Sequence, residues 1–160
     1  MADPRLIHIA LDEGTILAAR PEIEGERQAA VNDLIADNRF APCRAMAQGY
    51  EGPFRATLRV EEGRLAIEVA DRDGRALETI MLGMARFRRP VRDYFAICDS
   101  YFNAVAGSSP AHIEPIDMAR RALHNEGAEL LTDCLKNKID IDFPTARRLF
   151  TLVAALHIRG

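Results

Sequence analysis

A run of alternating apolar and polar residues in the middle of this 160-residue chain constrains its fold more than any other feature. Apolar side chains occupy every second position from Phe54 to Val60 and again from Leu65 to Val69, and the β-prone segment 76–84 continues the run. This period of two is typical of strands with one buried face. Glu-Gly and Asp-Gly dipeptides at 62–63 and 73–74 separate the segments and favour tight turns. The sequence therefore predicts a three-strand antiparallel meander.

The rest of the chain predicts one further strand and several helices. Leu6–Leu11 is short and rich in β-forming residues, so we expect a strand there. Prolines, caps and helical periodicity predict helices from Pro21 to about Asn38, from Pro90 to Gly107, from Pro110 to Lys136, and from Asp142 to near Gly160. Pro115 interrupts the third of these, which is therefore either one kinked helix or two pieces. Residues 39–53 show little periodicity and predict a long loop.

Together these elements predict an α+β fold. We expect a small antiparallel sheet, made of the three-strand meander plus the N-terminal strand, packed against about four helices. The length is typical of one domain, so residues 1–160 are expected to form a single globular unit. Within it, residues 1–84 are expected to be mainly strands with one helix, and residues 85–160 to be helical.

The composition limits the classes of partner and compartment. Acidic residues number 24 and basic residues 21, giving a net charge of −3, so nucleic acid is not the expected partner. The sequence shows neither an apolar run near the ~18 residues of a membrane span nor the pattern of a secretion signal. Cys43, Cys98 and Cys134 are odd in number and widely spaced, which favours reduced thiols. We therefore expect a cytoplasmic protein without a membrane partner.

A cluster of arginines lies where a helix is expected to begin, at Pro90. Its members are Arg86, Arg88, Arg89 and Arg92. The start of a helix carries about half a positive charge, so acidic side chains are preferred there. We therefore expect an anion nearby, which is either an acid of the chain, such as Glu78 or Asp93, or an external ligand or partner. Arg147 and Arg148 repeat the pattern more weakly in the last helix.

Arg120 is the other unusual arginine, since helical periodicity places it on the apolar face of its helix. His124 and Asp117 lie at the border of the same face. Burying an unpaired guanidinium costs several kcal/mol, so Arg120 needs an acidic partner, for which Asp117 is a local candidate, or it lines a pocket. One interpretation is a buried salt bridge between helices. In the other, Arg120 orients an anion, His124 exchanges protons, and Asp117 sets the tautomer of the ring.

Familiar catalytic and metal motifs are not found in the sequence. It contains no phosphate-binding glycine loop, nucleophile elbow, dinucleotide-binding motif or calcium loop, and His124 lacks the second histidine of a zinc protease motif. We therefore expect no cofactor and no metal. The leading hypothesis is a binding or regulatory module that recognises an anionic ligand or a protein partner through the arginine-rich helix start, with a homodimer as one form. The alternative is an enzyme acting on a phosphorylated or carboxylated metabolite, with His124 as acid or base.

Three segments of the chain resemble an uncharacterised bacterial protein family of about 160 residues. They are FRRPVRDYFAICDSY from Phe87 to Tyr101, IDMARRALHNEG from Ile116 to Gly127, and IDIDFPTARRLFTLVAALH from Ile139 to His157. The resemblance covers most of the chain, although the loop from Cys43 to Gly52 departs from it. It implies a cytoplasmic bacterial protein with no assigned activity, often encoded near histidine-biosynthesis genes. It supplies no catalytic residues.

Overall fold

The predicted meander forms the centre of the sheet in the computed structural model. β3 (Phe54–Glu61), β4 (Arg64–Ala70) and β5 (Ala76–Gly83) pair in antiparallel fashion, as their period of two predicts. The turn between β3 and β4 consists of Glu62 and Gly63, whose φ angles are 51° and 74°. A two-residue turn of this kind matches the twist of paired strands, and glycine adopts a positive φ without a steric cost.

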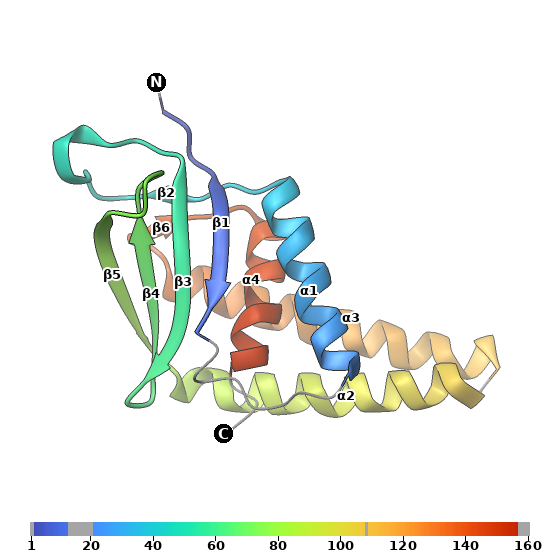
Figure 1. Cartoon of the computed structure of the whole chain (residues 1–160). Helices are drawn as coiled ribbons and strands as arrows, with labels where there is room; N and C mark the ends of the chain where they lie inside the picture. The colour runs from blue at the N-terminus through green and yellow to red at the C-terminus, as the bar shows by residue number, and fades with distance from the viewer. Residues whose placement is uncertain (1, 13–20, 108, 157–160) are drawn as a thin grey trace.

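The N-terminal strand β1 (Leu6–Leu11) joins the same sheet beside β3, in the order β1-β3-β4-β5. It runs parallel to β3, so the sheet is mixed, whereas the sequence analysis expected an antiparallel sheet throughout. The physical reason is α1 (Pro21–Ala36), which follows β1 and returns the chain along the sheet before β3 begins (Figure 1). Parallel neighbours need such a crossover, because a tight turn reverses the direction of the strand.

The structure describes residues 2–12, 21–107 and 109–156, so the expected end of the last helix near Gly160 lies outside it. The remaining elements are β2 (Ala41–Pro42), the 3-10 turns η2 (Ala47–Gly49) and η3 (Ala85–Phe87), α2 (Arg88–Gly107), α3 (Pro110–Cys134), β6 (Ile139–Asp140) and α4 (Phe143–Leu156). α3 is one continuous helix that contains Pro115. The α+β class is confirmed.

The segment 39–53, expected as a long loop, contains two short pieces of regular structure. β2 pairs in antiparallel fashion with β6, far along the chain, and η2 follows it. Strands of two residues are too short to show a period in the sequence. The segment therefore connects α1 to the sheet while also contacting the turn that precedes α4.

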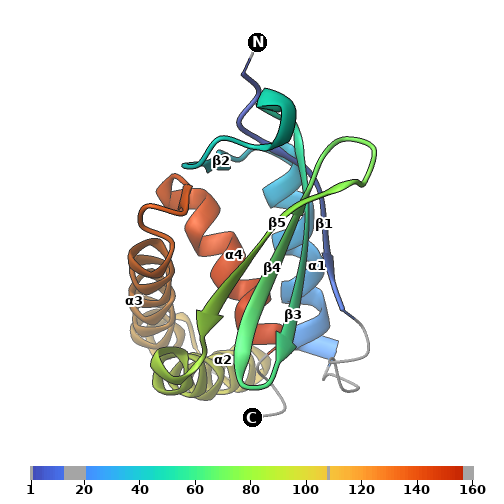
Figure 2. The same cartoon turned by 90° about the vertical axis from the view of Figure 1, so that its left-hand side faces the viewer.

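The helices are arranged on one face of the four-stranded sheet. α4 lies behind the sheet and contacts α1, α3 and β3, while the opposite face of the sheet is turned towards the viewer in Figure 2. The α2–α3 hairpin starts beside the end of β5 and extends away from the sheet past α1 (Figure 1). Among the helices of the described residues, none combines the length and apolar character needed to cross a membrane.

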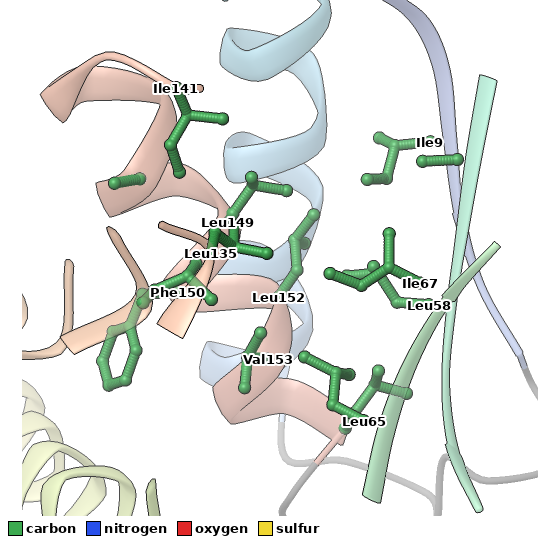
Figure 3. Packing of buried hydrophobic residues seen from close by; sticks show 14 of the residues in the cluster. Ile9, Leu58, Leu65, Ile67, Leu135, Ile141, Leu149, Phe150, Leu152 and Val153 are labelled. Carbon is green, nitrogen blue, oxygen red and sulfur yellow. The ribbon is translucent and has the colours of Figure 1, made fainter. Parts of the chain in front are cut away.

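α4 is the centre of the hydrophobic core. Its residues from Leu149 to Leu156 are all buried, as expected for a helix that is apolar on every side. Leu152 and Val153 face the sheet residues Leu65 and Ile67, and Phe150 points away from the sheet towards the other helices (Figure 3). The core therefore lies in two connected parts, one on each side of α4.

Side-chain hydrogen bonds tie the first residues of β1 and α4 to the rest of the fold. The Asn38 amide accepts a hydrogen bond from the Leu6 N–H over 2.7 Å and donates to the Leu6 carbonyl over 3.0 Å. The predicted cap at Asp142 is confirmed, since its carboxylate accepts from the Thr145 N–H over 3.0 Å. The Thr145 hydroxyl in turn accepts from the Arg39 N–H over 3.0 Å. These contacts fix the end of α1 between the first strand and the last helix.

Gly127 provides a test of the packing between α3 and α4. A Cβ atom at this position would lie 2.4 to 2.5 Å from atoms of the Phe150 ring, which is far inside van der Waals contact. We expect Gly127→Ala to lower the free energy of unfolding by about 1–2 kcal/mol, because overpacking outweighs the gain in helix propensity. Urea denaturation measures the change.

Gly25→Ala is the matched control for this substitution. Gly25 also lies in a helix, but a Cβ atom there would meet no described atom within 4 Å. Its replacement should leave the free energy of unfolding unchanged or raise it by up to about 1 kcal/mol. If Gly127→Ala changed the free energy of unfolding no more than Gly25→Ala does, the close approach of α3 and α4 would be contradicted.

Candidate functional site

Carboxylates of the same chain occupy part of the arginine-rich helix start. The Arg86 guanidinium donates to the Asp133 carboxylate, near the end of α3, over 3.1 Å. Arg89 donates to Asp93 on α2 over 3.0 Å and also pairs with Glu126 on α3. Two of the four arginines of this helix start therefore pair with α3, Arg86 from η3 and Arg89 from α2.

The other two arginines of this start are exposed. α2 begins at Arg88, two residues before the expected Pro90. Arg92 is 76% exposed and lies 3.8 Å from the Asp93 carboxylate, and Arg88 has no described carboxylate within 4 Å. The four arginines thus have different surroundings, and of these only Arg89 and Arg92 approach the same carboxylate.

A second group of polar side chains gathers where the four helices meet, and we call it the interhelical polar cluster. Its members are Glu26 on α1, Tyr94, Cys98 and Tyr101 on α2, Asp117, Arg120 and His124 on α3, and Arg147 on α4. Both predicted catalytic residues and one predicted ligand-binding arginine therefore belong to this group, together with residues from other helices.

Arg120 is held on the α3 side of this cluster, with its side chain 20% exposed. Its Nη2 and Nε atoms donate to the Asp117 carboxylate over 2.8 and 3.1 Å, which confirms the local partner expected from the sequence. The guanidinium stacks on the Tyr101 ring, 4.5 Å from its centroid. The Glu26 carboxylate lies 4.0 Å away. Arg120 is therefore fixed by one close carboxylate, one distant carboxylate and an aromatic ring.

His124 is fixed by α4. Its Nε2 atom lies 2.8 Å from the Arg147 main-chain oxygen and 2.9 Å from the Thr151 hydroxyl. The Arg147 Nη2 atom is 3.3 Å from the Nδ1 atom of His124. The His124 ring stacks on the Tyr94 ring, with centroids 5.3 Å apart. These contacts match a neutral ring that donates from Nε2 to the carbonyl and accepts at Nδ1 from the guanidinium.

Asp117 does not set the tautomer of His124, contrary to the expectation from the sequence. It pairs with Arg120 and with Arg121, over 2.8 and 3.3 Å. Asp117 and His124 are seven residues apart on one helix, which separates them by about 10 Å along its axis. The ring nitrogens instead bond to residues of α4.

Burial keeps the ionisable groups at the centre of the cluster uncharged. It lowers the pKa of His124 to about 4, and the positive charges of Arg147 and Arg120 act in the same direction. Burial raises the pKa of the Cys98 thiol to about 11 and also raises the pKa of Tyr94. Near neutral pH the histidine is therefore unprotonated, and the thiol and phenol keep their protons. The arginines and carboxylates carry the charge of the cluster.

Two buried polar atoms of the cluster have no hydrogen-bond partner among the described residues, the Tyr94 hydroxyl and the Arg147 Nε. The Cys98 thiol neighbours the hydroxyl but is a weak partner. Arg147 also has no described carboxylate within 4 Å, although Arg120 has one at hydrogen-bond distance. A guanidinium that is partly buried without a counter-ion is costly, so this position favours an added anion.

The sequence contained a signal for part of this cluster. Val91, Tyr94, Cys98 and Tyr101 follow one another at spacings of three, four and three, which places Tyr94 and Tyr101 on the side of α2 that faces α3. Arg147 showed only a weak anomaly at the start of the last helix. Its meeting with His124 depends on the packing of α3 against α4, which no local pattern predicts.

The lowered pKa of His124 predicts how stability depends on pH. The unfolded ring has a pKa near 6.5, so between about pH 6.5 and pH 4 the unfolded chain binds a proton that the folded chain does not. Stability that is present above pH 6.5 should therefore be lost as the pH falls towards 4. We expect the wild type to lose on the order of 1–3 kcal/mol more than His124→Gln over this range, measured by urea denaturation. Equal losses in both proteins would rule out a buried neutral ring.

Comparison with known proteins finds relatives along the whole chain. A model of the Uncharacterised protein family (UPF0262) matches residues 3–159. The chain is 57% identical to a UPF0262 protein of Sphingopyxis alaskensis, over 99% of this chain and 98% of that protein. It is 56% identical to one of Erythrobacter litoralis, over 100% of both, and 47% identical to one of Rhodospirillum rubrum, over 97% and 93%. No solved structure matches the chain.

Proposed function

The chain belongs to the Uncharacterised protein family (UPF0262), and we propose that it is a binding module whose interhelical polar cluster takes a small anionic ligand. The family name gives no activity, so the proposal depends on the chemistry of the cluster. It keeps the class of ligand and the Arg120 site that the sequence suggested, and it adds Arg147. A cytoplasmic location is part of this proposal.

Arg147 carries the main argument. Its Nε is buried without a hydrogen-bond partner, its Nη2 donates to a neutral histidine, and no described carboxylate balances its charge. A phosphate or carboxylate group would supply both the missing acceptor and the missing negative charge. Guanidinium groups bind these planar or tetrahedral oxyanions through two parallel hydrogen bonds. An oxyanion is thus the ligand class that this arrangement favours.

The surroundings of Arg147 support the same class of ligand. Both carboxylates of the cluster, Asp117 and Glu26, lie against Arg120, and the unprotonated His124 adds no charge, so the charge of Arg147 has no close counter-ion among the described residues. Electrostatic attraction is stronger in a partly buried site than at the surface, because water screens it less. The uncompensated charge of Arg147 would therefore attract an anion from solution.

The geometry supports binding better than proton transfer. A general acid or base must exchange a proton with its substrate near the working pH. Both nitrogens of His124 are already hydrogen-bonded to Arg147, and the pKa of the ring is lowered to about 4. An enzyme that uses His124 on a phosphorylated or carboxylated metabolite is therefore the less supported alternative. The expected gene neighbourhood near histidine biosynthesis stays a prediction and does not select the ligand.

The start of α2 supports a second candidate, the recognition of an acidic segment of a protein partner. Arg88 and Arg92 are four residues apart, so they share one face of the helix. Both are exposed, and neither has a described carboxylate within normal hydrogen-bond distance. This candidate uses the same arginines that the sequence singled out, but not the interhelical polar cluster.

Titration with inorganic phosphate tests the leading proposal. The wild-type unfolding temperature should rise with phosphate, since a ligand that binds only the folded state adds about 1.4 kcal/mol at ten times its Kd. Arg147→Gln should remove this rise, because the amide has neither the charge nor the paired donors of the guanidinium. Chloride at matched ionic strength corrects for general salt effects. A parallel titration with succinate separates phosphate from carboxylate preference.

Two further variants locate the response. Arg148→Gln is the matched control, since Arg148 is adjacent but donates to the Asp37 carbonyl instead, and it should keep the wild-type response. Arg88→Gln combined with Arg92→Gln should also keep it, whereas loss of the response in this variant would move the site to the start of α2. The proposal would be contradicted by a wild type whose unfolding temperature changes with neither anion, or by an Arg147→Gln variant whose unfolding temperature rises as much as that of the wild type.

A further inference from the structure

The first half of α3 has apolar side chains on two opposite faces. The inner face leads to the buried residues Gly127, Ala128 and Leu131, which pack against the other helices. The opposite face is exposed, and we call its apolar residues the outer stripe: Ala111, Pro115, Met118 and Ala122. At about 100° per residue these four positions lie within about 60° of one another. An exposed helix face is usually polar, so the outer stripe needs an explanation.

The exposure of the outer stripe is concentrated in one part of the molecule. Met118 is 59% exposed and Val105, on α2, is 54% exposed, the two highest values among the large hydrophobic residues of the described chain. Val105 lies two residues before the end of α2, and Met118 lies in the first half of α3. The end of the α2–α3 hairpin extends beyond the rest of the fold (Figure 1). Further along the same face of α3 the exposed residue is Glu129, so the apolar character ends where the hairpin returns to the core.

The spacing of the outer stripe fits a partner helix. Its residues follow one another at intervals of four, three and four, which is the repeat by which two helices pack along a seam. Glu114 and Arg121 lie seven residues apart on the same flank of this stripe. If a second copy of α3 lies antiparallel across the stripe, Glu114 of each copy lies opposite Arg121 of the other.

The flanking charges identify the occupant. Glu114 has no ion pair among the described residues, and Arg121 pairs with Asp117 over 3.3 Å while its side chain stays 57% exposed. The two charges have opposite signs and lie three and a half positions on either side of a point next to Met118, so the surface is complementary to itself about that point. A second copy of this chain therefore forms two ion pairs across the axis, each between Glu114 of one copy and Arg121 of the other. An unrelated apolar helix would offer matching charges only by coincidence.

We propose that two copies of the protein associate through their outer stripes, antiparallel about a two-fold axis next to Met118, midway between Glu114 and Arg121. The two α2–α3 hairpins then form a four-helix arrangement. Arg120 lies on the opposite side of α3 from Met118, at about 160° by helical periodicity, so this association leaves the interhelical polar cluster unobstructed. It does not depend on anion binding.

Analytical ultracentrifugation of the full chain over a concentration series tests the association. The wild type should show a concentration-dependent species of about twice the 17.8 kDa mass of the chain. Met118→Lys should weaken the association roughly tenfold or more, because it places two lysines next to the axis. Met81→Lys is the matched control, since Met81 is also an exposed methionine, at 38%, but lies on β5 and should not alter the association.

A charge exchange tests the antiparallel register. Glu114→Arg and Arg121→Glu should each weaken the association severalfold, because each places like charges opposite one another. The double variant should recover most of it, with the charges exchanged across the axis. Circular dichroism confirms that all variants are folded, and the phosphate response of the cluster should stay unchanged in Met118→Lys and Glu114→Arg. A wild type that remains monomeric at its highest soluble concentration, an unaffected Met118→Lys, or a double variant weaker than both single variants would overturn the proposal.

Discussion

The contact between Gly127 on α3 and the Phe150 ring on α4 sets the spacing of the helical layer, and the interhelical polar cluster depends on it. Without a side chain at position 127, the backbone of α3 approaches the ring directly. Tyr94 meets the edge of the same ring, with centroids 5.7 Å apart, so three helices converge at this point. His124 and Arg147 each stand three residues before these contact residues, and the same close approach brings them within hydrogen-bond distance.

The character of the cluster follows from the balance between burial and charge. Burial removes the charge of a histidine by lowering its pKa, but it cannot remove the charge of an arginine, whose pKa lies far above neutral pH. Closing the helices around His124 and Arg147 therefore leaves one neutral and one charged group. The neutral ring can accept a hydrogen bond from the guanidinium without repelling it. The result is a partly buried cation whose partners are neutral acceptors.

The sequence predicted the parts of this fold that depend on local patterns. The meander follows from a period of two, Asp142 from its capping position, and the Arg120–Asp117 pair from a spacing of three on one helix. The parallel pairing of β1 and the meeting of His124 with Arg147 were not predicted. Both depend on how distant elements pack, and the sequence gives no local signal for the direction in which α1 returns the chain or for the side of α4 that faces α3.

The amide of Asn38 bonds to both main-chain groups of Leu6, and this has a consequence for the edge of the sheet formed by β1. It takes the place of a neighbouring strand at the position where β1 begins, so no extended segment of another molecule can add there without displacing it. It also prevents β1 from slipping by one residue, because a slip would turn the main-chain groups at this position towards β3 and invert the faces of Leu6, Ile9 and Leu11. A single side chain thus protects the strand against both intermolecular growth of the sheet and misalignment during folding.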